Sequence, residues 1–421
     1  MNIYLVIILV ILIGKYILDL VVDILNVKNA VPVLPKEFEG YYDADKYKKS
    51  QVYLRENINF GIIKDTLFAV ITVAFILMGG FNIVDKIARG FGYGEIITGL
   101  IFAAILVLAI YLMGLPFSIY DTFVIEEKYG FNKTTAKTFV LDILKGLLLG
   151  AIIGGIVFTG ILWFFGETGK WAWVCCWGGV TVFMLFMAFI APVVILPLFN
   201  KFIPLEDGEL KQEIEKYAAR ENFKLKGIFK MDASRRSTKS NAFFIGFGKY
   251  KRIVLYDTLI AKHTVDELVC VLAHEIGHYK KKHFIKGITM SILTMGLMFY
   301  ILSLFINNEG LFAAFKMEQT SIYASLFFFG FLYTPISMIL SIFGNIISRK
   351  YEYQADAYAV LTHKKPESFI TALKKLVVEN LSNLTPHPLK VFLDYTHPPV
   401  LKRIEAIRNQ MVKDNFKGIP K

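Results

Sequence analysis

The chain has few charged residues for its length. Only 19% of its 421 residues are Asp, Glu, Lys or Arg, whereas a soluble protein carries about 25%. Hydrophobic residues make up 55% of the chain, and its mean hydropathy is +0.50. This composition argues against a soluble protein and favours an integral membrane protein.

Cysteine is also scarce. Of the three cysteines, Cys175 and Cys176 are adjacent within an apolar run, and Cys270 stands alone. This spacing excludes a disulfide framework, and it offers no cysteine site for a metal. The first apolar run lacks a basic segment before it and a small-residue cleavage site close behind it. We therefore interpret that run as a retained membrane span and not as a signal peptide.

Long apolar runs are what the sequence does have. Each reaches or approaches the roughly 20 residues that a helix needs to cross the hydrocarbon core. They predict seven transmembrane helices, at about 3–25, 62–80, 96–118, 143–165, 171–199, 284–306 and 322–347.

Lys and Arg residues are distributed unevenly between these runs. The segments after the odd-numbered runs, 26–61, 119–142, 200–283 and 348–421, are rich in them. The segments after the even-numbered runs hold only Lys86 and Arg89, then Lys170, then Lys316. Because cytosolic loops carry the excess of basic residues, the amino terminus is expected outside and the carboxyl terminus in the cytosol.

The same count predicts the domain organisation. Segments 200–283 and 348–421 fall on the cytosolic side, where we expect them to form the two parts of one catalytic domain. Residues 1–199 hold helices one to five, and 284–347 hold helices six and seven. The two catalytic parts would meet at the membrane surface.

The segment 269–284, "VCVLAHEIGHYKKKHF", contains an H-E-x-x-H pattern at His274, Glu275 and His278. The capping-box signature Thr264-x-x-Glu267 predicts that a helix begins just before it. Two histidines four residues apart lie on one helix face and reach one metal ion, while Glu275 is placed as a general base toward water. The alternative is a solvated helix that holds two histidines by chance.

A third protein ligand is still required. The continuation H-x-x-G-x-x-H is absent, because Lys281 and Phe284 stand where its Gly and His would be, and His283 is one residue out of register. We predict Glu352, in "SRKYEYQADAYAVL", as the third ligand. Asp356, one turn later, would accept a hydrogen bond from a ligating histidine. The alternative is a carboxylate pair on a helix surface.

The chain resembles the type I CaaX prenyl proteases, which are integral membrane zinc metalloendopeptidases. The resemblance rests on the H-E-x-x-H segment and on four further segments in the same order. These are "YDTFVIEEKYGFNKTT" (120–135), "LPLFNKFIPLEDGEL" (196–210), "SNAFFIGFGKYKRIVLYDTL" (240–259) and "THPPVLKRIEAI" (396–407). It extends from about Lys36 to near the carboxyl terminus.

This resemblance implies an all-α multi-pass fold: seven transmembrane helices forming a barrel around a chamber, capped by a cytosolic zinc-protease domain. "AFFIGF" and "KRIVLY" are expected to form a small β-hairpin whose edge binds an extended peptide. Residue by residue, the resemblance implies the following roles: His274, His278 and Glu352 as ligands of one Zn²⁺ per chain, Glu275 as general base, Asn241 and Ala242 as holders of the substrate backbone, and His397 and Arg403 near the scissile carbonyl.

The implied activity is removal of the last three residues from proteins or peptides that end in a prenylated CaaX sequence. We expect a monomer in the lipid bilayer, either of a prokaryotic inner membrane or of the endoplasmic reticulum, with a peptide or lipidated protein as substrate and no nucleic-acid partner. One alternative is a quality-control zinc protease that cleaves non-prenylated membrane proteins. Another is a seven-span transporter or receptor without hydrolytic activity, which would not explain why Glu275, Glu352 and Asp356 stand in register.

Overall fold

The structure, a computed structural model, describes residues 2–245 and 252–414. Seven helical segments in this part of the chain are long and apolar enough to cross a membrane. They consist of α1 (Ile3–Asn29), α2 (Ala44–Leu77), α4 (Glu95–Tyr120) with the π-helical turn η2 (Asp121–Glu126), α5 (Ala136–Glu167), α6 (Ala172–Ile190) with η3 (Gly169–Trp171), η4 (Ala191–Ile195) and α7 (Leu196–Phe199), α11 (His283–Ser303), and α13 (Ile322–His363).

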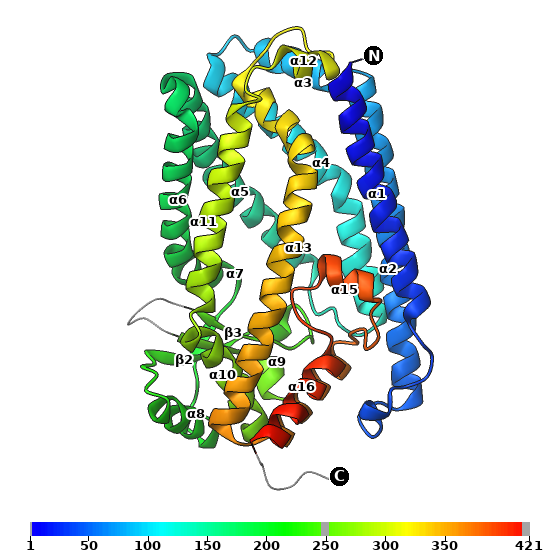
Figure 1. Cartoon of the computed structure of the whole chain (residues 1–421), viewed down its shortest axis with the longest axis vertical. Helices are drawn as coiled ribbons and strands as arrows, with labels where there is room; N and C mark the ends of the chain where they lie inside the picture. The colour runs from blue at the N-terminus through cyan, green and yellow to red at the C-terminus, as the bar shows by residue number, and fades with distance from the viewer. Residues whose placement is uncertain (1, 246–251, 415–421) are drawn as a thin grey trace.

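These long helices stand side by side as a barrel (Figure 1). In a filled bundle, each helix would bury one face against its neighbours. Here the most apolar 18-residue stretch of α2 is only 6% buried, and that of the α6 segment is 0% buried. The barrel is therefore not packed solid by its own side chains.

Two short helices, α3 (Gly80–Arg89) and α12 (Glu309–Ala314), lie across the end of the barrel at which the chain begins, and α12 contacts α1 (Figure 1). Aromatic rings fill this end. Phe315 stacks on Phe328 with the ring centroids 3.9 Å apart, and Phe81 meets Phe328 edge-on. This apolar cluster ties the ends of the spans together.

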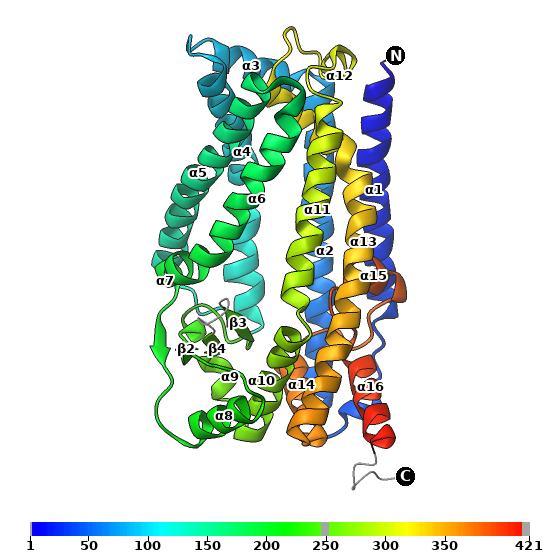
Figure 2. The same ribbon diagram turned by 60° about the vertical axis from the view of Figure 1, so that its left-hand side comes forward.

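The opposite end carries a hydrophilic domain (Figure 2). Its helices are η1 (Lys36–Phe38), α8 (Glu209–Arg220), η5 (Ala233–Arg235), α9 (Asp257–Ile260), α10 (Val265–Lys280), α14 (Pro366–Glu379), α15 (Pro388–Asp394) and α16 (Val400–Lys413). The core between them includes Leu272 and Ile276 of α10, Phe369 of α14 and Ile404 of α16. Segments on both sides of the α11–α13 hairpin in the sequence thus build one core.

A four-stranded sheet belongs to this domain. Its order is β1 (Phe202–Pro204), β2 (Gly227–Met231), β4 (Arg252–Tyr256) and β3 (Ala242–Ile245). The predicted pairing of "AFFIGF" with "KRIVLY" is confirmed, since β3 runs antiparallel to β4 with Phe243 opposite Val254. The sheet is larger than the predicted hairpin, because β2 adds parallel to β4 and β1 adds antiparallel to β2. β3 remains at the edge.

Two helices are longer than the apolar runs indicate. α2 begins at Ala44 and not near 62, and its polar first part buries Tyr47, Ser50 and Gln51 against the hydrophilic domain. α13 continues without a break from the seventh span to His363. Hydropathy misses both extensions because it reports only the part of a helix that contacts lipid.

Candidate metal centre and active site

The site begins on helix α10. Thr264 caps this helix, and the capping box with Glu267 that the sequence predicts is present. The helix places His274 and His278 four residues apart on one face, with their Nε2 atoms 3.1 Å apart. His274 is only 8% exposed, so its imidazole lies within the domain and not on a solvated surface.

Glu352 reaches the same point from helix α13. Its Oε2 lies 3.4 Å from His274 Nε2, and its Oε1 lies 3.2 Å from His278 Nε2. Oε2 is buried without a hydrogen-bond partner among the described residues. A buried carboxylate oxygen without a donor costs free energy unless a cation satisfies it.

These three side chains fit a metal ion. Donor atoms about 2.0–2.2 Å from a tetrahedral zinc ion lie about 3.3–3.6 Å from one another. Each histidine Nε2 lies close to this distance from the other Nε2 and from the nearer Glu352 oxygen, and one donor atom from each of the three residues lies within 4.8 Å of the other two. Two imidazoles and one carboxylate are also a donor set that zinc accepts while leaving a fourth position open. Among the described residues, His274, His278 and Glu352 form a group that could hold a metal ion.

Gly277, the fourth residue of the pattern, allows the two helices to come this close. A methyl group added at Gly277 would lie 3.1 Å from both the Cα and the carbonyl oxygen of Ala355. These are backbone atoms of α13 and cannot rotate away. Glycine here therefore lets Glu352 of α13 approach the histidines of α10.

Asp356 lies one turn beyond Glu352 and contacts His274 on its other ring nitrogen. Its Oδ1 is 2.8 Å from His274 Nδ1. Burial alone would lower the pKa of His274, but the Asp356 and Glu352 carboxylates raise this pKa to about 9. The carboxylates thus favour positive charge at this point, which a bound divalent cation would supply in place of a proton.

Arg403, on α16, is paired with Asp356. Its Nε and Nη2 donate to the two carboxylate oxygens at 2.8 and 2.6 Å. The acidic surroundings hold the pKa of this guanidinium above its usual value despite burial. Nη1 lies 3.7 Å from Glu352 Oε2. Arg403 therefore neutralises the buried carboxylates and orients Asp356.

His397 precedes α16, which begins at Val400 after Pro398 and Pro399. Its Nε2 lies 3.4 Å from Glu352 Oε1, and its side chain is 65% exposed. His397 and Arg403 therefore approach Glu352 at different oxygens, one from the open side of the site and the other from the buried side. Glu275, next to His274, is partly buried, and burial raises the pKa of its carboxyl group.

Asn241 and Ala242 lie where edge strand β3 begins, and β3 contacts α10. Asn241 Oδ1 accepts a hydrogen bond from the Ala242 amide at 2.8 Å. Asn380, which sequence reasoning did not assign to the site, holds the preceding residue. Its side chain accepts from the Ser240 amide at 3.1 Å and donates to the Ser240 carbonyl at 3.3 Å.

His283 and Gln354, which the sequence did not place in the site, form a hydrogen-bonded pair next to His278. His283 Nδ1 lies 3.1 Å from His278 Nδ1, and His283 Nε2 lies 2.9 Å from Gln354 Oε1. The His283 ring also stacks on Tyr351, with centroids 4.0 Å apart. The spacing of His283 argued against its being a ligand, and only the fold shows that it contacts the candidate ligand His278.

Comparisons with known proteins agree with this geometry. Residues 23–201 match the CAAX prenyl protease N-terminal domain, described as five membrane helices, and residues 204–411 match peptidase family M48. A protein of Oryza sativa subsp. japonica named CAAX prenyl protease 1 homolog is 36% identical over 96% of this chain and 97% of its own.

The chain belongs to peptidase family M48.

Other relatives extend this finding. CAAX prenyl protease 1 of Saccharomyces cerevisiae is 34% identical over 89% of this chain and 88% of its own. The crystal structure of S. mikatae Ste24p superposes with a TM-score of 0.91 at 32% identity, covering 96% of this chain and 99% of that one. The predicted family and the seven-helix membrane fold are thus confirmed, and this M48 protein is a membrane metallopeptidase.

In this M48 peptidase the Gln354–His283 pair is expected to set the tautomer of His278. An amide oxygen only accepts, so His283 Nε2 carries a proton and His283 Nδ1 accepts from His278 Nδ1–H. His278 Nε2 is then left with its lone pair toward the metal position. Asp356 does the same for His274.

Breaking this arrangement is expected to weaken metal binding. Gln354→Leu and His283→Ala should each raise the Kd for zinc by about 10–100-fold, the usual effect of losing a hydrogen bond to a ligating histidine. Competition with a chelating dye measures the Kd. Gln212→Leu, at an exposed position on α8, is the matched control. Unchanged zinc affinity in both variants would show that His278 needs no such support.

Proposed function

We propose that this metallopeptidase removes the last three residues from proteins or peptides that end in a prenylated CaaX sequence, and that it uses one zinc ion. The observation that carries the proposal is the buried His274–His278–Glu352 group on a chain whose relatives, over nearly their full length, are named CAAX prenyl protease 1.

In the proposed mechanism, His274, His278 and Glu352 hold the zinc ion. When bound, zinc polarises a carbonyl group and makes water a stronger nucleophile at neutral pH. Glu275 takes the proton of the attacking water and passes it to the departing amine. Its partly buried position next to His274 supports this role.

Other residues of the chain bind the substrate and the developing charge. The free edge of β3, beginning at Asn241 and Ala242, pairs with the extended substrate backbone, since an edge strand offers unpaired amides and carbonyls. His397, exposed at the open side of the site, donates to the oxygen of the scissile carbonyl. Arg403 adds positive charge from the buried side, and its ion pair with Asp356 keeps His274 in place.

Matched peptides test the substrate. Purified, zinc-loaded protein is incubated with CaaX peptides of one sequence, farnesylated or not, and mass spectrometry maps the cleaved bonds. We expect cleavage directly after the modified Cys, with kcat/KM for the prenylated peptide at least tenfold higher. Equal cleavage of both peptides, or cleavage at scattered bonds, would favour a quality-control protease instead.

We further propose that the hydrophilic domain faces the cytosol, in a prokaryotic inner membrane or in the endoplasmic reticulum. The support is the excess of Lys and Arg in the short segments 26–61 and 119–142, which lie on the same side as the hydrophilic domain, over the short segments on the other side. We also propose that the protein acts as a monomer, because one chain supplies every residue of the site. Our proposed domain division consists of residues 1–199, 200–283, 284–347 and 348–421.

Cysteine labelling tests this orientation. In a variant without the three native cysteines, Tyr93→Cys reports on the α3–α4 loop, where the side chain is 57% exposed. Asp207→Cys reports on the hydrophilic domain, where the side chain is 94% exposed. With the protein expressed in a bacterial inner membrane, we expect an impermeant maleimide to label only Tyr93→Cys in intact cells and both positions after lysis. Labelling of only Asp207→Cys in intact cells would invert the topology.

A further inference from the structure

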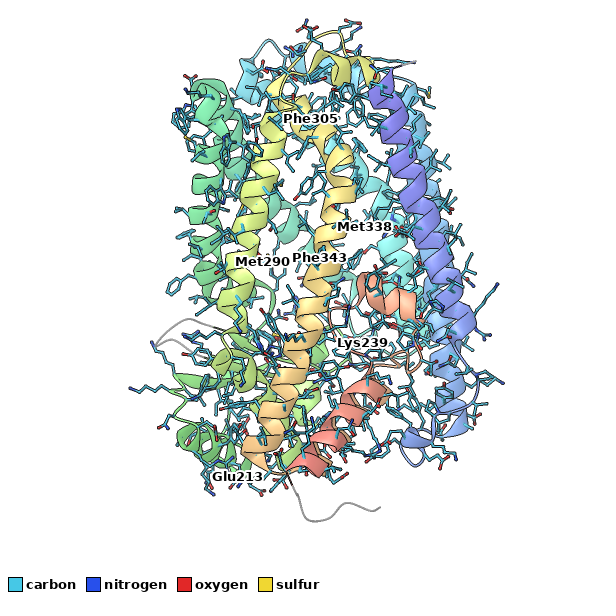
Figure 3. The ribbon with its side chains drawn as sticks, in the orientation of Figure 1. Glu213, Lys239, Met290, Phe305, Met338 and Phe343 are labelled. Atoms are coloured by element: carbon cyan, nitrogen blue, oxygen red, sulfur yellow. The ribbon has the colours of Figure 1, made fainter. Side chains whose placement is uncertain are left out.

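A cavity of 480 Å³ lies between helices α11 and α13. These helices cross the membrane side by side, and Figure 3 labels Met290 on one and Phe343 on the other. Met290 lines the cavity. The mechanism described above makes no use of this space.

The cavity walls combine hydroxyl groups with apolar side chains. α13 contributes Ser337, Ser341 and Ser348. Successive members are four and then seven residues apart, so all three lie on one face of the helix. α11 contributes Ser291 and Thr294 opposite them. Polar side chains within a membrane span face the protein interior or a water-filled space. Two such faces lining one cavity therefore indicate a hydrated path.

This path begins at the metal centre. His283 and Tyr351 form its wall at the end nearest the hydrophilic domain. His283 Nδ1 is 3.1 Å from His278 Nδ1, so only one imidazole separates the cavity from a candidate metal ligand. The cavity therefore lies next to the candidate metal centre.

The cavity also carries an uncompensated positive charge. Lys286, one turn along α11 from His283, lines it with an ammonium group 5.4 Å from the centre of the Tyr351 ring. No Asp or Glu lines the cavity, and Lys286 forms no ion pair with any carboxylate among residues 2–245 and 252–414. A cation with no counter-ion in a partly enclosed polar space favours an anionic ligand.

We propose that this cavity binds the carboxyl-terminal end of the peptide substrate, with Lys286 paired to the α-carboxylate of its last residue. The inference rests on the proposed removal of three residues. To that function the inference adds Lys286 as the residue that recognises the free carboxyl end of the substrate. The carboxylate is the one anion that every such substrate carries, whatever its sequence.

The dimensions agree with this assignment. Three extended residues span about 10 Å. Lys286 lies three residues beyond His283, about 4.5 Å along the helix axis, and its flexible side chain covers further distance. The carboxylate of a peptide cut three residues from its end would thus lie within reach of the ammonium group. The hydroxyl groups beyond would hydrate it.

The proposal explains why the bond that is cleaved lies a fixed number of residues from the carboxyl terminus of the substrate. A carboxylate fixed at Lys286 sets the distance to the metal centre, so that the bond three residues away is presented to it. A peptide without a free carboxylate loses this charge-assisted hydrogen bond, which ordinarily contributes enough to change affinity by about 10–100-fold.

The experiment compares a prenylated CaaX peptide with its carboxyl-terminal amide, in wild-type protein and three variants. In the wild type we expect the amide to raise KM by about 10–100-fold with kcat changed less than threefold. Lys286→Met should raise KM for the acid to the amide's value and abolish the acid–amide difference. Lys286→Arg should retain that difference. Lys281→Met, at an exposed lysine just after α10, is the control and should behave as wild type.

A binding measurement separates this inference from the proposed function. The free tripeptide acid and its amide are titrated into zinc-loaded protein by calorimetry, which requires no cleavage. Tighter binding of the acid in the wild type, lost in Lys286→Met, would support the carboxylate site even if prenylated peptides were not cleaved. An acid–amide ratio that is near one in the wild type, or equal in wild type and Lys286→Met, would overturn it.

Discussion

Glu275→Gln is expected to lower turnover by about 10³–10⁴-fold while leaving the metal bound. The substitution removes a general base, whose contribution reaches about 10⁴-fold. It leaves the donor atoms of His274, His278 and Glu352 in place. Because Gln has nearly the same shape, neither the packing of α10 nor the Kd for zinc should change by more than about threefold.

Turnover and metal content must be measured on the same preparation. Metal analysis after dialysis reports occupancy, and a quenched-fluorescence CaaX peptide reports turnover. Glu405→Gln, which removes an exposed carboxylate on α16, is the matched control and should match the wild type in both. If Glu275→Gln kept more than a tenth of the activity, another group would have to act as base.

Glu352→Ala is expected to abolish both metal binding and activity. Without this carboxylate only two protein ligands remain, which is fewer than zinc sites in proteins use. The loss should also remove the effect of zinc on stability. A ligand that binds only the folded state, at 100 times its Kd, stabilises that state by about 2.7 kcal/mol.

Thermal unfolding in detergent, with and without added zinc, measures this effect directly. We expect zinc to raise the Tm of the metal-free wild type by several degrees and to leave that of Glu352→Ala unchanged. Glu318→Gln, at an exposed carboxylate on the far end of the barrel, should retain the full zinc-dependent rise. A stoichiometric zinc content in Glu352→Ala would rule out this ligand set.

Local patterns in the sequence predict those parts of the molecule that depend only on interactions between residues close together in the chain. Apolar runs long enough to cross a bilayer identified the seven spans. The capping box at Thr264 placed the start of α10, and the four-residue spacing of His274 and His278 placed both on one face. The segments "AFFIGF" and "KRIVLY" predicted the β3–β4 pair. In each case a few neighbouring residues carry the whole signal.

The local spacing of Glu352 and Asp356 also predicted that Asp356 would support a histidine, but the rest of the support of the site could not be predicted in this way. His283 contacts His278 only because α11 turns back at Lys282, whose φ of 58° allows the reversal. Gln354 meets His283 only because α13 passes beside that turn. Arg403 and Asp356 are 47 residues apart in sequence, and nothing near either residue indicates the other. Contacts of this kind depend on how whole helices pack.

The sequence by itself indicated the membrane spans, the helix that carries the two candidate histidine ligands and the candidate donor residues, because hydropathy, capping and helical period act within one segment. Only the tertiary structure decided how those donors are held. The close approach of α10 and α13 at Gly277 brings Glu352 to the histidines, and two independent hydrogen-bonded groups orient the two rings. The cavity that Lys286 lines likewise exists only where α11 and α13 lie side by side. No pattern within either helix alone could therefore have indicated it.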